Sequence, residues 1–233
     1  MDATFTPPPV PGRPRPPHKL LGDAMRRPGG RRALSVLSIV LALAGVGMFA
    51  YPFATDLWSA QIQSRLRTQF NNPEYREAYK NGTIKEGQGL TRLVIQEPFK
   101  LDVLVVQGTT PAALKAGAGH YRDTPLPGMP GNVGIAGHRT TYGRPFNRLN
   151  EMKAGHKVYL DTPIARYEYT VVPAFGGHAN PWPVAPTDYS VVAQPKTPGT
   201  KWLTLTTCHP KGSARQRLIL RLELTKTLPL PKE

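Results

Sequence analysis

The sequence predicts a mainly β outer domain, folded as a closed or nearly closed barrel, that follows a single transmembrane helix. Three observations carry this prediction. Residues 33–55 form a long apolar run without charge, and from residue 89 the apolar runs become short and rich in Val, Ile, Leu and Tyr. Proline (26) and glycine (22) are abundant among the 233 residues, as expected for a turn-rich β protein, and 39% hydrophobic content suffices for one ordinary core.

Residues 1–32 are rich in proline and arginine. Such a composition cannot bury enough apolar surface to fold, so we predict a disordered cytoplasmic tail with polyproline II character. A solvated tail explains this composition without a partner, although docking to a proline-binding protein is an alternative.

The apolar run 33–55 is long enough, as a helix of about 34 Å at 1.5 Å per residue, to cross a bilayer. Arginines 26, 27, 31 and 32 precede it. The positive-inside rule therefore places the N-terminus in the cytoplasm and everything after Asp56 outside the cell. A cleaved signal peptide is the alternative, but the run is long and begins late, so we favour an uncleaved signal anchor in the cell membrane.

Residues 56–88 are predicted to hold an amphipathic helix and a linker. Trp58, Ile62, Leu66 and Phe70 recur every four residues among polar neighbours. This apolar stripe should pack on the following domain or lie against the membrane.

Residues 89–233 form the predicted outer domain, with turn clusters separating its strands and no internal repeat. Short helices are expected at 111–116 and near 145–152. The expected strands are 92–96, 100–107, 132–138, 157–161, 165–173, 190–194, 201–208 and 216–225.

The formal charge of +15 and the pI near 10.2 suit an anionic partner such as membrane lipid, an acidic wall polymer or nucleic acid. The basic residues are spread along the chain, and the sequence has neither zinc-finger spacing nor a Gly-Lys-Ser/Thr phosphate loop. We therefore predict no nucleic-acid partner.

Cys208 is the only cysteine, so it cannot form an internal disulfide. An isolated thiol is either a packed side chain or a nucleophile, and its position at the end of a predicted strand favours the second. His138 also ends a predicted strand, and two strand ends can meet at one rim of a barrel. His120 and Tyr121 lie in a glycine-rich loop that could line a cleft.

A cation is expected near the thiol to stabilise a developing oxyanion. Arg217 opens the last long strand and should start at the same rim as Cys208, whereas Arg221 lies further along the same face. Arg217 is therefore the preferred candidate, with Arg221 or a backbone N–H as the alternative.

Together these residues resemble the sortase family of cysteine transpeptidases. The resemblance covers roughly residues 89–228 and includes the N-terminal anchor. It rests on Thr204-Leu-Thr-Thr-Cys208, on Gly137-His138, and on Arg217 before Leu-Ile-Leu. The stretch 127–143, which ends in Gly-His-Arg-Thr-Thr-Tyr-Gly, and Cys208-His-Pro210 look like class E, the housekeeping type of high-GC Gram-positive bacteria.

The resemblance implies an eight-stranded sortase barrel and cleavage of a C-terminal sorting signal between Thr and Gly through a thioacyl-enzyme. The signal is L-A-x-T-G or similar to L-P-x-T-G. The implied roles are nucleophile for Cys208, acid and base for His138, and oxyanion or carbonyl donor for Arg217. Thr207 would contact the signal, and Tyr142 would read its second residue.

The implied partners are surface proteins that bear the sorting signal and an amine of a peptidoglycan precursor. No cofactor is expected. A metal site at His209 and Cys208 is a minor alternative, since one cysteine with scattered histidines lacks ligand spacing. Two rival functions are a membrane-anchored cysteine hydrolase and a non-catalytic wall-binding module, the latter favoured by the basic charge.

Overall fold

The computed structural model describes residues 28–70 and 72–231, and the chain divides after Ala50 into two compact units. Helix α2 (Pro28–Phe70) begins in the first unit and ends in the second. Of the described helices it alone is long and apolar enough to cross a membrane, with a mean hydropathy of 2.3 in its most apolar part. Residues 1–27 of the predicted tail lie outside the described residues. Residues 28–32 are helical rather than disordered, and the helix begins at Pro28, a position that proline favours.

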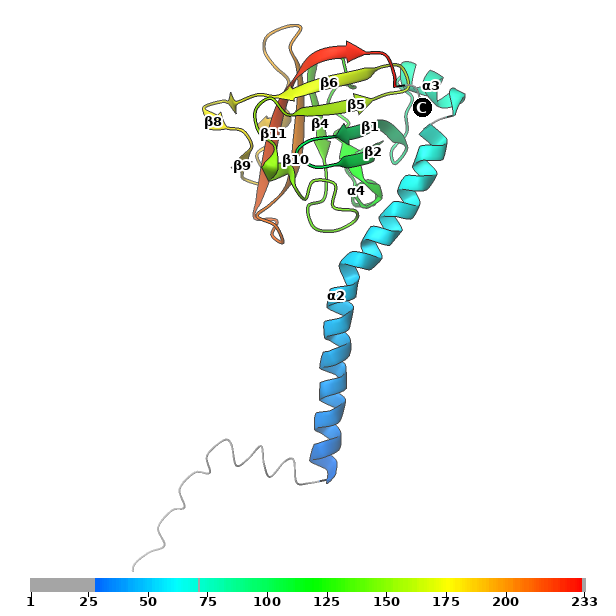
Figure 1. Ribbon diagram of the computed structural model, residues 1–233, viewed down its shortest axis with the longest axis vertical. Helices are drawn as coiled ribbons and strands as arrows, with labels where there is room; N and C mark the ends of the chain where they lie inside the picture. The colour runs from blue at the N-terminus through cyan, green and yellow to red at the C-terminus, as the bar shows by residue number, and fades with distance from the viewer. Residues whose placement is uncertain (1–27, 71, 232–233) are drawn as a thin grey trace, which may run out of the picture. The chain divides into compact units, whose positions relative to one another are not determined.

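The second unit is a closed barrel of eight strands, which confirms the predicted fold class (Figure 1). Their order around the barrel is β10-β4-β3-β2-β1-β5-β6-β11, and pairing of β10 with β11 closes the ring. The strands are β1 (Gly89–Ile95), β2 (Leu101–Gln107), β3 (Ala118–His120), β4 (Gly131–Ala136), β5 (Lys157–Asp161), β6 (Arg166–Val171), β10 (Lys201–His209) and β11 (Gln216–Leu228).

Three short strands lie in the long connection between β6 and β10. Strand β9 (Trp182–Val184) extends the sheet at β11, while β7 (Ala174–Phe175) and β8 (His178–Ala179) pair only with each other. The predicted strand 190–194 is wrong, because the chain there forms the 3₁₀ helix η2 (Tyr189–Val192). Its N-cap, Asp188, accepts a hydrogen bond from the Ser190 N–H, and such a cap favours a helical turn over an extended strand.

Besides α2 and η2, the described helices are α3 (Pro73–Lys80), α4 (Pro111–Ala116) and the 3₁₀ helix η1 (Leu149–Glu151). The prediction of a helix at 111–116 is confirmed, with the Thr110 side chain as its N-cap. Strand β3 falls in the stretch expected to be a glycine-rich loop. It is only three residues long and pairs with β2 and β4, so its extended backbone is imposed by its neighbours.

The alternation expected for β10 is confirmed by its burial. Leu203 and Leu205 are fully buried in the core together with Val133 and Ile135 of β4. Successive side chains of a strand point to opposite faces. Cys208 therefore lies on the face away from the core, on the same side as Thr204 and Thr206.

The C-terminal part of α2 packs on the outer domain, so the first of the two alternatives for its apolar stripe is correct. Leu66 is buried in a cluster with Leu104 and Val106 of β2, and Ile62 and Phe70 pack against that cluster. Trp58 is different, since 44% of its surface stays exposed.

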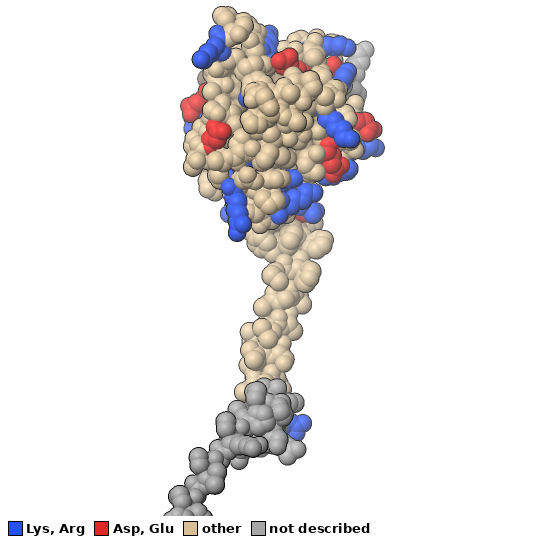
Figure 2. All heavy atoms as spheres, turned by 90° about the vertical axis from the view of Figure 1, so that its left-hand side faces the viewer, with Lys and Arg blue, Asp and Glu red and all other residues tan. Residues whose placement is uncertain are grey.

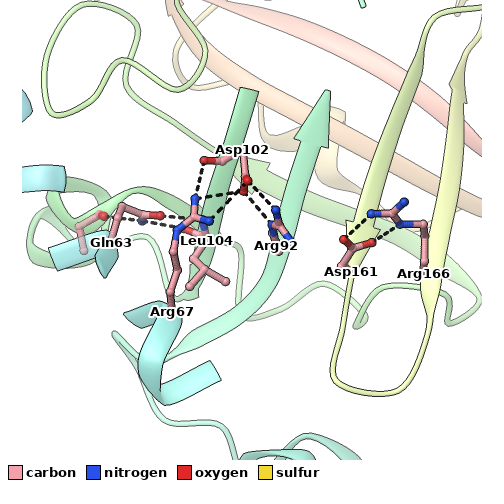
Figure 3. Close-up of polar contacts among 8 residues, drawn as sticks. Gln63, Arg67, Arg92, Asp102, Leu104, Asp161 and Arg166 are labelled. Carbon is pink, nitrogen blue, oxygen red and sulfur yellow. Dashed lines mark hydrogen bonds and ion pairs between the residues drawn. The ribbon is translucent and has the colours of Figure 1, made fainter. Parts of the chain in front are cut away.

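Polar contacts fix the register between α2 and β2 (Figure 3). The Gln63 Oε1 accepts the Leu104 N–H at 2.7 Å, while its Nε2 donates to the carbonyls of Leu104 (3.0 Å) and Ala116 (2.8 Å). Asp102 pairs with Arg92 of β1 and with Arg67 of α2. Hydrogen bonds from Arg92 and Arg67 hold the pKa of this carboxyl below its usual value.

Replacing Gln63 with alanine is expected to lower the free energy of unfolding of the outer domain by about 1–3 kcal/mol, because the Leu104 N–H and C=O lose their partner in a buried place. Chemical denaturation of the full chain in detergent micelles measures this loss. The matched control is Gln61→Ala on the exposed side of the same helix. Equal losses in the two variants would contradict the assignment.

Candidate functional site

Cys208 is the last residue but one of β10 and lies directly opposite Arg217 in the antiparallel pair β10–β11. Directly opposed residues have Cβ atoms about 4.5–5.5 Å apart and share one face of the sheet. The thiol is partly exposed and forms no disulfide. The expectation that Cys208 and Arg217 meet at one rim is therefore consistent with the register.

His138 reaches this rim because β4 runs parallel to β10. Ala136 pairs with Thr206, and the Gly137 N–H donates to the Thr206 carbonyl at 3.0 Å, so the two chains stay side by side beyond the end of β4. His138 follows two residues after the strand rather than inside it. His138 and Cys208 each follow two residues after the paired Ala136 and Thr206. Because the two strands are parallel, both residues are expected at the same edge of the sheet.

Gly137 lets the chain before His138 pass close to the core. A Cβ at this position would lie 2.6 Å from the ring of Phe146. Phe146 is itself fully buried, and its N–H donates to the His138 carbonyl at 3.1 Å. A side chain at position 137 would therefore clash with the Phe146 ring, and either that ring or the chain before His138 would have to move.

The expectation that Thr207 contacts a substrate is wrong for this structure. Its side chain points into the barrel, is 2% exposed, and donates to the Gly137 carbonyl at 2.7 Å. The residue before the cysteine thus ties the end of β10 to the residue before the histidine. The Thr207 hydrogen bond thus helps to set the spacing between Cys208 and His138.

The His138 imidazole is half-buried, and burial is the main reason that its pKa lies below the ordinary value of 6.5. The positive charge of Lys115 on α4 lowers the pKa further. Both effects favour the neutral imidazole near pH 7, which is the form that can accept a proton.

Arg217 is partly exposed, and its Nη1 donates to the carbonyls of Ala214 in the β10–β11 turn (3.0 Å) and of Gln216, the first residue of β11 (3.1 Å). Arg221, the alternative cation, is excluded by its surroundings. It lies opposite Thr204, is 2% exposed, and stacks between Phe175 (4.2 Å) and Trp202 (4.8 Å). Its Nη2 donates to the Val191 carbonyl, so it holds the β6–β10 connection against the barrel.

Arg139 is the residue of this rim that the sequence argument missed. It is buried, and its Nη1 donates to the Cys208 carbonyl at 3.1 Å and to the His209 Nδ1 at 3.0 Å. Its Nη2 donates to the Asn150 side chain at 2.8 Å. Its place beside His138 in the sequence does not show that its side chain reaches the end of β10, 69 positions away.

His120 does not line a cleft, contrary to expectation. It is 1% exposed, its Nδ1 contacts the Gln107 side chain at 2.8 Å and its Nε2 contacts the Pro125 carbonyl at 3.0 Å. Burial lowers its pKa to about 4, so it is a neutral structural residue. Tyr121, in contrast, lies on the outer face of the barrel, where its hydroxyl contacts that of Thr206 at 2.9 Å.

Tyr142 lies against the histidine, with 5.1 Å between the ring centroids of Tyr142 and His138. It therefore joins the rim that carries Cys208 and Arg217. Among residues 28–70 and 72–231, no three His, Cys, Asp or Glu side chains gather in a way that could hold a metal ion.

The barrel has counterparts among solved structures. It resembles the sortase D5 transpeptidase of Clostridium perfringens with a TM-score of 0.59, over 74% of this chain and 99% of that one, at 24% identity. At this identity the likeness concerns the fold alone, which is the closed eight-stranded barrel typical of sortases.

A model of the sortase domain matches residues 95–225, and the chain belongs to the sortase family. It is 28% identical over 228 residues to Sortase SrtE1 of Streptomyces coelicolor, over 89% of this chain but 62% of that protein's length. The structure of sortase E from Streptomyces avermitilis is 32% identical and has a TM-score of 0.53, over 62% of this chain and 93% of that one. As in other sortases, the apolar N-terminal helix fits a single-pass membrane anchor.

Proposed function

We propose that the chain is a class E sortase, a cysteine transpeptidase that transfers proteins bearing a C-terminal sorting signal to an amine of a peptidoglycan precursor. The observation that supports this proposal is the parallel pairing of β4 with β10, because His138 follows the end of β4 and Cys208, opposite Arg217, lies at the end of β10. Similarity to SrtE1 and to a sortase E structure supports the assignment to class E. The proposed signal, L-A-x-T-G, is the one that the resemblance to class E implies.

In the first half of the reaction, the Cys208 sulfur attacks the carbonyl carbon of the signal's threonine while the His138 imidazole accepts the thiol proton. Arg217 stabilises the negative charge that develops on the carbonyl oxygen. The bond between Thr and Gly then breaks, and His138 gives its proton to the departing glycine amine. The threonine remains on Cys208 as a thioester.

In the second half, the acceptor amine attacks the thioester and loses a proton to His138. The carbon–sulfur bond breaks, and the thiol regains a proton. Tyr142, which lies against His138, would read the second residue of the signal, and Tyr121 would contact it on the outer face beside Thr206.

The test is mass spectrometry of the full chain in detergent micelles with an L-A-x-T-G peptide, with and without an amine acceptor. A transpeptidase gives an acyl adduct on Cys208 and an amide product in the presence of the amine. A cysteine hydrolase, the first rival, gives only the carboxylic acid. A non-catalytic module gives no adduct.

The wall-binding rival draws its support from the basic charge of the chain. The face of the outer domain in Figure 2 carries charged side chains mainly around its periphery and uncharged ones at its centre. Labelling with a methanethiosulfonate reagent separates the two functions, because a reactive Cys208 is modified quickly and a packed one slowly.

The orientation in the membrane follows the arginine cluster before the apolar helix, so residues 89–233 would lie outside the cell and residues 1–32 in the cytoplasm. Because Cys208 is the only cysteine, an impermeant maleimide added to intact cells reports its side of the membrane. Lack of labelling in intact cells, with labelling after lysis, would overturn this orientation.

Replacing Arg217 with alanine is expected to lower kcat by roughly 10²–10³, the loss typical of removing one oxyanion donor. Steady-state kinetics with the signal peptide and an amine measure the loss. The matched control is Arg215→Ala, an exposed arginine of the same turn. A loss well below tenfold would assign the oxyanion to a backbone N–H, since Arg221 is buried beneath the β6–β10 connection.

A further inference from the structure

We propose that Asp56 of α2 is a positioning residue for His138. It acts by holding the loop 140–145, here named the post-histidine loop, so that Tyr142 stays against the imidazole ring. The proposal rests on the proposed function, because the positioned residue, His138, is the proposed acid and base. It gives the part of α2 that contains Asp56 a role in arranging the catalytic residues.

Asp56 binds the post-histidine loop with both carboxylate oxygens. Oδ1 accepts the Gly143 N–H at 2.9 Å, and Oδ2 pairs with the Arg144 guanidinium at 2.6 Å. The Asp56 side chain is 22% exposed and that of Arg144 is 47% exposed, so the carboxylate is the better shielded partner of this ion pair. Asp56 alone therefore binds the post-histidine loop both through the backbone, at Gly143, and through a side chain, at Arg144.

The segment that Asp56 grips is conformationally strained. Tyr142 (φ 53°) and Arg144 (φ 47°) are the non-glycine residues with positive φ in the described part of the chain, and Gly143 between them has φ 74°. Side chains other than glycine adopt this region only when their surroundings impose it, and such strain gathers at functional sites. Without the contacts from α2, we expect the three residues to relax.

Gly143 also has to be small for α2 to approach. A Cβ there would lie 3.0 Å from the Ser59 hydroxyl, one helical turn beyond Asp56. The Thr55 hydroxyl accepts the Tyr142 N–H at 3.4 Å on the same side of the helix. The post-histidine loop therefore lies directly on α2, with little room for a different path.

Tyr142 passes this constraint to the histidine. Its ring meets that of Trp58 edge-on at 6.0 Å, its hydroxyl lies 3.2 Å from that of Tyr51, and Lys115 sits 5.6 Å from its ring centroid. The same ring lies 5.1 Å from that of His138, centroid to centroid. The tyrosine is thus held by α2 and α4 at the place where it limits the movement of the imidazole.

The experiment compares Asp56→Ala with the wild type in the full chain, in detergent micelles, using an L-A-x-T-G peptide and an amine acceptor. We expect kcat to fall about 10-fold to 10²-fold, because a small misplacement of a catalytic group has effects of this size. KM should rise by a smaller factor than kcat falls, and some rise is expected because Tyr142 is also proposed to read the signal. Asp56→Asn retains an oxygen acceptor for the Gly143 N–H and should recover part of kcat.

The matched control is Glu77→Ala, which removes an ion pair of similar length (2.8 Å to Lys80) from helix α3, away from the post-histidine loop. Hydrogen exchange of the peptide that covers residues 140–146 gives a second measurement that does not depend on activity. It should be faster in Asp56→Ala and unchanged in Glu77→Ala.

Faster exchange with the expected fall in kcat supports the proposal. Unchanged exchange, or faster exchange with kcat at the wild-type level, overturns it and leaves the proposed function intact. Equal losses of kcat in Asp56→Ala and Glu77→Ala also overturn it. A wild-type chain that makes no amide product contradicts the proposed function instead, and the exchange measurement then still decides whether Asp56 holds the loop.

Discussion

Replacing Cys208 with alanine is expected to abolish both cleavage of the sorting-signal peptide and its transfer to the amine, with a loss in kcat on the order of 10⁴ or more. Without the sulfur, no thioester can form. The fold should persist, because Cys208 is partly exposed at the end of β10 and its removal opens no core cavity. Product formation by liquid chromatography and the unfolding midpoint of the same sample measure both effects.

Cys208→Ser is the control for shape, since it keeps a polar group of similar size in place of the thiol. It should fold as the wild type does and remain nearly inactive, because a hydroxyl is a far weaker nucleophile than a thiol near neutral pH. Amide product from the alanine variant at a rate near that of the wild type would end the transpeptidase proposal.

Replacing His138 with alanine is expected to lower kcat by about 10²–10⁴, the usual contribution of a general acid and base. In each half of the proposed reaction, His138 moves a proton at the thiol and at an amine. The rates of cleavage and of transfer should therefore fall together. The matched control is His178→Ala, an exposed histidine of β8. A loss confined to transfer would assign the first proton transfer to another group.

The pH profile of the wild type gives an independent check of the histidine. Burial, and then Lys115, lower the pKa of His138, so the neutral base persists to more acidic pH than in an ordinary histidine. The acid limb of kcat/KM should therefore fall with a midpoint below pH 6.5. A midpoint above 6.5 would show that another group controls this limb, or that the site favours the protonated imidazole.

The spacing of apolar residues in the sequence predicted which side chains of a strand or helix face the core. The inward leucines of β10 and the outward Cys208 follow from a period of two, and the apolar stripe of α2 follows from a period near four. The helix at 111–116 was readable from its threonine cap and proline. Cys208 and Arg217 were predicted to lie close together because each is at an end of its predicted strand. Their direct pairing across β10 and β11 agrees with this prediction.

The errors concern residues whose surroundings come from distant parts of the chain. His120 looked accessible beside glycines, but Gln107 and Pro125 enclose it. Thr207 was placed on the substrate, although alternation from Cys208 already put it on the core face. Asp56 and Arg139 could not be found from local sequence, because their partners in the post-histidine loop and at the end of β10 are 69 or more positions away.

Arg139 also settles the tautomer of the histidine that follows the cysteine. A guanidinium can only donate hydrogen bonds, so the contact between its Nη1 and the His209 Nδ1 requires that this nitrogen offer a lone pair. The ring proton of neutral His209 must then sit on Nε2. In this arrangement His209 has no free acceptor nitrogen with which to take the proton of Cys208. Adjacency in the sequence would suggest His209 as the base, yet its hydrogen bonding leaves that part to His138.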